Sequence, residues 1–120
     1  AHIVRAALEA MAHQTADLAQ AFADDGVEWT RLKIDGGMTA NNWMAQDIAD
    51  ILQIEVIRPQ FVETTALGAA MLAAVGCAIH TDLDAAAQAM IGEVESFQLA
   101  MSDDDRNTRA ANWARAIEKL

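Results

Sequence analysis

A pair of glycines stands where a short apolar run gives way to a helical pattern. Asp35 ends the run, Gly36 and Gly37 follow it, and Asn41 comes shortly afterwards. Two adjacent glycines let the backbone turn sharply and approach another group closely, because neither carries a Cβ. The helix expected next presents unpaired N–H groups and a partial positive charge at its first turn. A strand, a glycine turn and a helix N-terminus in this order are typical of a site that holds the phosphates of a nucleotide.

Each residue of this corner also has a purely structural interpretation. The two glycines are compatible with a plain strand-to-helix turn. Asparagine near a helix start can cap the helix, and Asn42 could do this in place of Asn41. Asp35 is either a magnesium ligand or a hydrogen-bond acceptor at the turn, and the second interpretation is favoured.

Apolar spacing predicts the elements that position the corner. The first helix covers residues 3–22 and stops at Gly26, and its apolar residues at helical spacing are Ile3, Ala7, Ala10, Met11, Leu18, Ala21 and Phe22. A strand over 29–35, a helix over 40–52 and a strand over 54–57 follow, and Arg58-Pro59 stops the second strand. Because a helix joins the two strands, they should be parallel, with the glycine corner at a carboxyl end where ligands bind.

The second half of the chain is predicted to be mostly helical. Thr64 or Thr65 caps a helix that runs to Val75, and Asp82 or Asp84 caps a short helix through Ala89. Residues 92–101 are expected to be irregular, and Ser102 with Asp105 opens the last helix. Two strands are few for a sheet, so further strands are expected to belong beside them.

Three small residues of the third helix raise separate expectations. Gly68 and Gly76 weaken a helix, so either close packing or a nearby ligand should account for them. Cys77 is the only cysteine and is expected to be a buried core thiol. A single cysteine forms no internal disulfide, which favours a reducing, cytoplasmic compartment.

Composition limits the classes of partner. Hydrophobic residues make up 53% of the 120 residues, and the formal net charge is -10. An acidic surface repels nucleic acid and anionic lipid, so neither is expected as a partner. No apolar run reaches the roughly 18 residues of a membrane span. A bound nucleotide would be held by local backbone donors and Mg²⁺. The chain starts at Ala1, without methionine and inside a helical pattern, which suggests a fragment or a processed product.

Several segments together resemble the C-terminal end of the FGGY-family carbohydrate kinases, and most closely the glycerol kinases within that family. The segments are His2–Glu9, Asp35–Asn42, Arg58-Pro59, Glu63–Ala70, Arg106-Asn107 and Trp113. They occur in the family's order and spacing over almost the whole chain. Each is weak alone, since Asp-Gly-Gly is common, and the combination is specific.

The resemblance implies an α/β fold. Residues 1–120 would form the latter part of an actin-like, ribonuclease H-like domain that binds the nucleotide, with short parallel strands flanked by helices. It further implies that Gly37 contacts ATP through its backbone and that Asn41 contacts it through its side chain. Gly36 makes room for the turn.

The resemblance also implies a reaction. These enzymes transfer the γ-phosphoryl group of ATP to a glycerol hydroxyl, with Mg²⁺ and an aspartate base. The base and the polyol-binding residues belong to parts of the family that this chain lacks, so the piece alone should be inactive. The alternatives are a kinase of another polyol or sugar, or a non-catalytic nucleotide-binding or interaction fragment. The incomplete sheet leads us to expect a homo-oligomer.

Overall fold

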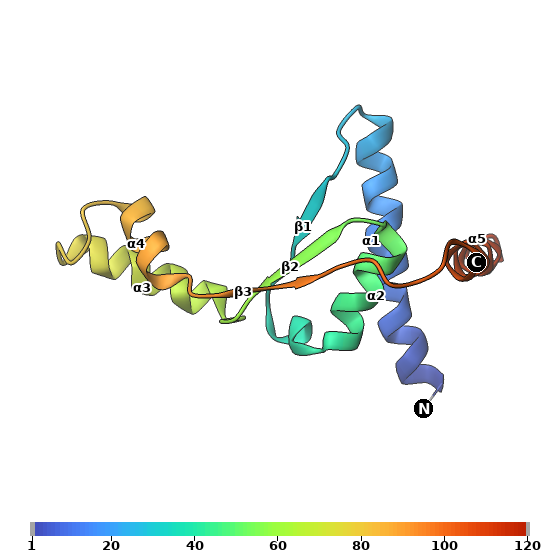
Figure 1. The fold of residues 1–120 in the computed structure, drawn as a ribbon, viewed down its shortest axis with the longest axis horizontal. Coiled ribbons are helices and arrows are strands. Elements are labelled where there is room, and N and C mark those ends of the chain that lie inside the picture. Colours follow the sequence, from blue (N-terminus) through green and yellow to red (C-terminus); the bar gives the residue numbers. More distant parts are fainter. Residues whose placement is uncertain (1, 120) are drawn as a thin grey trace.

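The computed structural model describes residues 2–119 and consists of a small sheet with helices around it (Figure 1). In chain order the elements are α1 (His2–Asp24), β1 (Arg31–Lys33), the short 3-10 helix η1 (Gly37–Ala40), α2 (Asn42–Leu52), β2 (Glu55–Pro59), α3 (Thr64–Gly76), α4 (Leu83–Met90), β3 (Val94–Phe97) and α5 (Asp103–Ile117).

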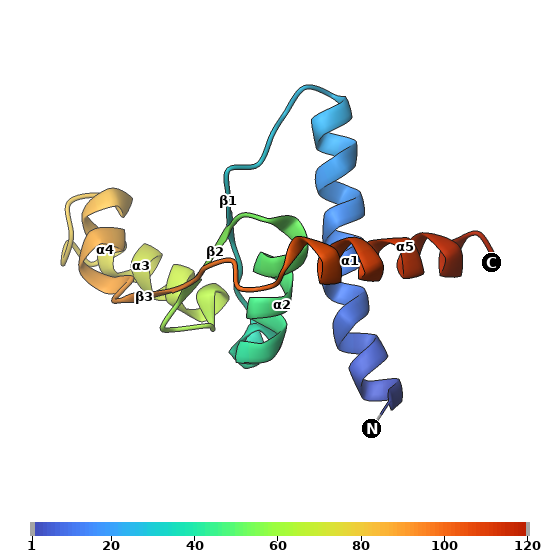
Figure 2. The ribbon, with the colours of Figure 1, turned by 45° about the vertical axis from the view of Figure 1, so that its right-hand side comes forward.

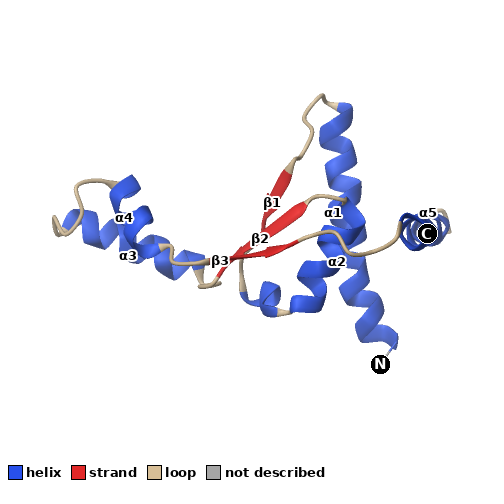
Figure 3. Cartoon of the chain, in the orientation of Figure 1, coloured by secondary structure: helices blue, strands red, loops and turns tan. Residues whose placement is uncertain are grey.

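The sheet has the strand order β1-β2-β3 (Figure 3). β1 and β2 are parallel and are joined through α2, which confirms the predicted α/β crossover. β3 runs antiparallel to β2, and this strand was wrongly predicted to be irregular. The sequence of β3 does not show the alternation of a half-buried strand, because Glu95 places a charge on the same side of the strand as the buried Phe97.

Both predicted strands have different bounds in the structure. β1 is limited to three residues, although the pattern indicated residues 29–35. β2 continues through Arg58 and Pro59, so this pair does not stop the strand as predicted. Pro59 is tolerated because it is the last residue of β2, opposite Val94, where the ladder is ending.

The core lies where α1, α2 and the sheet meet. Its buried members are Ala12, Met44, Ala45, Ile48, Ala49, Ile51, Val56 and Phe97. The predicted stripe of α1 is not its buried face, since Ile3, Leu18 and Phe22 are exposed and Ala12 and His13 are buried instead. Alanines of both helices, Ala12, Ala45 and Ala49, are fully buried in this core.

α3 and α4 pack against each other and extend away from the sheet (Figure 1). Cys77 follows α3 and is exposed, which contradicts the predicted buried thiol. A Cβ added at Gly68 or Gly76 would meet nothing within 4 Å, so packing within residues 2–119 does not explain these glycines. Glu63 is the N-cap of α3 and makes no side-chain capping bond, so the expected threonine cap is also wrong.

α5 crosses α1 (Figure 2) and is attached mainly through polar contacts. The Ser102 hydroxyl accepts a hydrogen bond from the amide of Asp105 at 3.2 Å, which confirms the predicted start of this helix. Asp82 caps α4 in the same way, through the amide of Ala85. None of the helices in residues 2–119 combines the length and the hydropathy that crossing a membrane requires.

Candidate phosphate-binding corner

The corner follows β1 directly. The amide of Ile34 donates to the carbonyl of Ile57 at 2.9 Å, which prolongs the contact between β1 and β2. Gly36 then adopts φ 89° and ψ 161° while its amide donates to the carbonyl of Val62 at 3.0 Å. This backbone region is essentially restricted to glycine, so Gly36 is needed for the turn itself.

A 3-10 helix separates the glycine turn from α2. We expected a direct passage into a helix starting at Ala40, whereas η1 comes first and α2 starts at Asn42. Thr39 is buried, and its hydroxyl donates to the carbonyl of Gly36 at 2.7 Å. The amides of Gly37 and Met38 have no hydrogen-bond partner among residues 2–119, and both residues are exposed. The start of η1 therefore presents two adjacent free donors to solvent.

Asn41 is the N-cap of α2. Its Oδ1 accepts a hydrogen bond from the amide of Met44 at 3.2 Å, so the capping interpretation applies to Asn41 and not to Asn42. Its amide nitrogen donates no hydrogen bond within residues 2–119, and the residue is exposed beside η1. Capping and ligand contact are therefore compatible, because they use different atoms of one side chain.

Gly37 differs from Gly36, because the fold does not require glycine at its position. Its φ is not positive, and an added Cβ would meet only the Glu63 Oε1 atom, at 3.9 Å. That is an ordinary van der Waals distance to the end of a flexible side chain. Nothing within residues 2–119 demands glycine here.

Asp35 accepts a hydrogen bond from the Thr64 hydroxyl, which confirms its predicted role as an acceptor at the turn. This bond joins the corner to the first turn of α3. Below it lies a hollow of about 270 Å³ lined largely by apolar side chains, including Ile57, Leu67 and Ile91. Gly68 is not among the residues that line this hollow.

The contacts that Arg58 makes with the corner were not predicted from the sequence. Arg58 was interpreted as part of a strand stop, yet its side chain reaches from β2 to the carbonyl of Thr39 and to Asn42. The available signal was the alternation of the strand, which places Arg58 on the same face as Val56. A buried arginine beside a core valine needs acceptors, and two of them lie in the corner.

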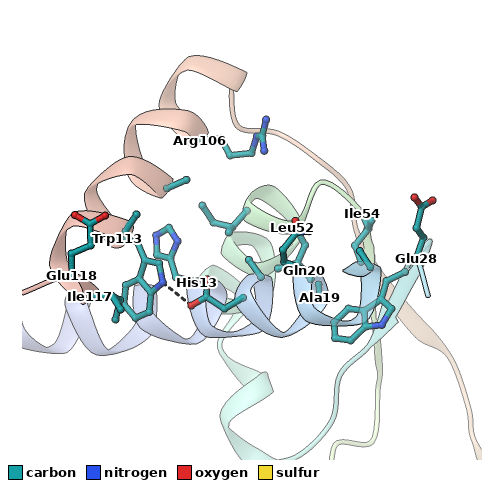
Figure 4. A pocket seen from close by; sticks show the side chains of 17 residues that line it. His13, Ala19, Gln20, Glu28, Leu52, Ile54, Arg106, Trp113, Ile117 and Glu118 are labelled. Carbon is teal, nitrogen blue, oxygen red and sulfur yellow. Dashed lines mark hydrogen bonds between the residues drawn. The ribbon is translucent and has the colours of Figure 1, made fainter. Parts of the chain in front are cut away.

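A larger groove of about 780 Å³ lies between α1 and α5 (Figure 4). In Figure 4 the His13 and Trp113 rings lie side by side, with centroids 5.2 Å apart. Burial lowers the pKa of His13, and the charge of Arg109 lowers it further. None of Gly36, Gly37 and Asn41 lines this groove, so it is separate from the corner.

Comparison with known proteins shows what kind of chain carries this corner. The C-terminal domain of the FGGY family of carbohydrate kinases matches residues 1–77. The chain belongs to the FGGY family. The matched range of this FGGY chain includes the whole corner and Arg58, whereas Glu95 and α5 lie beyond it.

Curated relatives of this FGGY chain are glycerol kinases. The enzyme of Xanthomonas axonopodis pv. citri is 43% identical over 118 residues, which cover 98% of this chain and 23% of that protein. A Clostridium botulinum glycerol kinase is 44% identical over 119 residues, which cover 98% and 24%. The crystal structure of Plasmodium falciparum glycerol kinase with ADP matches with a TM-score of 0.75 and 32% identity, over 98% of this chain and 24% of that one. The chain thus spans about a quarter of the length of these relatives.

Proposed function

We propose that this chain is the nucleotide-binding part of a glycerol kinase-like enzyme that transfers the γ-phosphoryl group of ATP to a hydroxyl of glycerol. The observation that carries the proposal is the corner itself. The amides of Gly37 and Met38 have no partner among residues 2–119, and no neighbour in that range requires glycine at position 37. The identity to glycerol kinases and the likeness to one solved with ADP support the nucleotide and the acceptor.

The corner suits an anionic ligand in an acidic protein. The formal net charge of -10 provides no general attraction for phosphate, so binding depends on local donors. Backbone amides at a helix start supply such donors. The side-chain amide nitrogen of Asn41, the N-cap of α2, adds another. In phosphoryl transfer the protein mainly positions groups and stabilises charge, which is the work we assign to this corner.

Mg²⁺ neutralises phosphate charge in such reactions. No group of three or more His, Cys, Asp and Glu side chains within residues 2–119 could hold a metal ion. Asp35, the carboxylate of the corner, is engaged by Thr64. Our proposal assigns no magnesium ligand to these residues. The aspartate base and the glycerol-binding residues likewise belong, in our proposal, to the other three quarters of the enzyme.

The test is a Gly37→Val variant of the full-length enzyme that contains this chain. A side chain at this position occupies the space in which the nucleotide approaches, so the KM for ATP should rise about tenfold or more. The KM for glycerol should stay the same. Gly68→Ala is the matched control, because its Cβ meets open space and lies outside the corner. An unchanged KM for ATP in Gly37→Val would reject the proposal.

A further inference from the structure

Arg58 is a buried cation in the middle of the sheet. Its side chain is 9% exposed, and it lies on β2 opposite Glu95 of β3. The guanidinium carbon lies 5.1 Å from the ring centroid of Phe97, a core residue. Removing a charge from water is expensive unless hydrogen-bond acceptors replace the lost hydration.

Three acceptors surround this guanidinium, and they come from two parts of the fold. On the sheet side, Nη2 donates to the carboxylate of Glu95. On the corner side, Nη1 donates to the backbone carbonyl of Thr39, and Nη2 donates to Oδ1 of Asn42 at 2.7 Å. Arg58 therefore ties β2 and β3 to both η1 and the first residue of α2.

We infer that Arg58 is the positioning residue of the corner, fixing η1 so that the amides of Gly37 and Met38 point to where the nucleotide phosphates bind. The inference rests on the proposed function. Thr39 transmits the constraint, because its carbonyl accepts from Arg58 and its hydroxyl holds the carbonyl of Gly36. If either corner-side contact is lost, a buried charge loses an acceptor, so the loop and the cation are held in one arrangement.

The arginine fork is essential to this role. Two nitrogens of one rigid plane serve acceptors from the sheet and the loop at the same time. A lysine keeps the charge and an aliphatic stem, but its single ammonium cannot reproduce the planar fork. Arg58→Lys therefore separates the positioning contact from the mere presence of a positive charge.

The experiment measures steady-state kinetics of the full-length enzyme with three variants. Arg58→Lys should raise the KM for ATP about tenfold while the KM for glycerol changes less than about twofold. Asn42→Ala removes one corner-side acceptor and should raise the KM for ATP in the same direction by a smaller factor. Glu95→Gln is the control on the sheet side, because the amide oxygen still accepts and no corner contact changes. Its KM for ATP should equal that of the parent.

The outcomes separate the two claims. If Gly37→Val raises the KM for ATP and neither Arg58→Lys nor Asn42→Ala does, the positioning role is rejected and the proposed function stands. If none of the three raises it, both fail. Equal rises in the KM for ATP and for glycerol, with a lowered melting temperature, would show a general structural role and overturn the inference. If Arg58→Lys does not fold, Asn42→Ala decides alone, since Asn41 and not Asn42 caps α2.

Discussion

Gly36 and Gly37 are neighbours with different requirements. The backbone of Gly36 occupies a region that side chains rarely enter, whereas Gly37 has ordinary dihedrals and space for a Cβ. The fold therefore explains the first glycine but not the second, and we propose that the second makes room for the nucleotide. The folding role of Gly36 and the ligand role of Gly37 can therefore be tested separately.

We predict that Gly36→Ala lowers the free energy of unfolding by about 1–3 kcal/mol, because the added Cβ strains the turn. Gly37→Ala should change it by less than about 0.5 kcal/mol. Urea denaturation followed by circular dichroism measures both variants against the parent. Equal losses in the two variants would show that Gly37 also has a folding role.

Substitutions at Asn41 can distinguish the role of its Oδ1 atom from that of its side-chain amide nitrogen. Asn41→Ala removes the cap and should cost about 0.5–2 kcal/mol of stability. Asn41→Ser keeps an oxygen for the amide of Met44 but lacks the side-chain amide, so stability should be nearly retained. Both variants should weaken the binding of ADP to the full-length enzyme, measured by isothermal titration calorimetry. Parent-like affinity in Asn41→Ser would leave Asn41 as a cap alone.

For single residues, the sequence predicts where a residue lies better than what its side chain does. Asp35, Gly36, Gly37 and Asn41 were placed correctly at a strand-to-helix corner, because turn and cap chemistry is local. Arg58 could not be assigned, because its partners Thr39 and Glu95 are distant in sequence and only the fold brings them together.

Among the elements, α5 shows docking by charge more than by apolar burial. None of its residues is buried, yet Arg109 donates two hydrogen bonds to the carboxylate of Asp47, which is only 3% exposed. Asp50 is also buried and accepts from the amides of Ala100 and Met101, just before α5 begins. Two aspartates of α2 therefore contribute to the position of the last helix.

Arg109→Met should lower the free energy of unfolding by about 3 kcal/mol, because it leaves a buried carboxylate without its partner. The double variant Arg109→Met with Asp47→Leu should recover part of this loss, since no unpaired charge remains. Chemical denaturation of the single and double variants measures the difference. A double variant less stable than Arg109→Met alone would contradict this account of the docking.

His13 should make stability depend on pH. Its folded-state pKa lies below the ordinary 6.5, chiefly through burial and then through Arg109, although Asp47, Glu9 and Asp17 oppose the shift. Below about pH 6.5 the unfolded chain binds a proton more readily than the folded chain, so the free energy of unfolding falls as pH falls. Above that pH both states are neutral and the effect disappears.

The variant His13→Phe isolates this contribution, because a phenyl ring can still stack on Trp113. Between about pH 8 and about pH 5.5 the parent should lose more stability than the variant does. Thermal or urea unfolding at the two pH values gives both losses. Identical losses would show that His13 does not contribute to the pH dependence.

As a whole molecule the chain is open. Its radius of gyration is 17.5 Å, against about 13.6 Å for a compact domain of this length. Its accessible surface is 8024 Å², against roughly 6300 Å² for a folded monomer of this mass. Large apolar side chains contribute, with Ile3 86% and Leu72 62% exposed. We propose that the rest of the kinase covers these faces.

The 120-residue chain produced alone should therefore self-associate, in line with the predicted homo-oligomer. β1 has β2 as its neighbour in the described sheet and leaves its other edge for pairing, and the exposed helices add apolar area. Light scattering over a range of concentrations should give a mass that rises with concentration. A constant monomer mass would contradict this prediction.

The fold was predictable where the signal was local and apolar. The parallel pair with its crossover helix, and the caps at Asp82 and Ser102, follow from short patterns. β3 was missed because the charge of Glu95, on the same face as Phe97, is paired with a residue of another strand. The exposure of Cys77 was missed because the sequence does not tell that α3 leaves the sheet.

The most direct measurement of the central claim is a crystal structure of the full-length enzyme with a non-hydrolysable ATP analogue. We predict that the nucleotide lies within hydrogen-bonding distance of the backbone at Gly37 and Met38, with the Asn41 side chain beside it. A nucleotide bound well away from this corner, with both amides still facing solvent, would contradict the account.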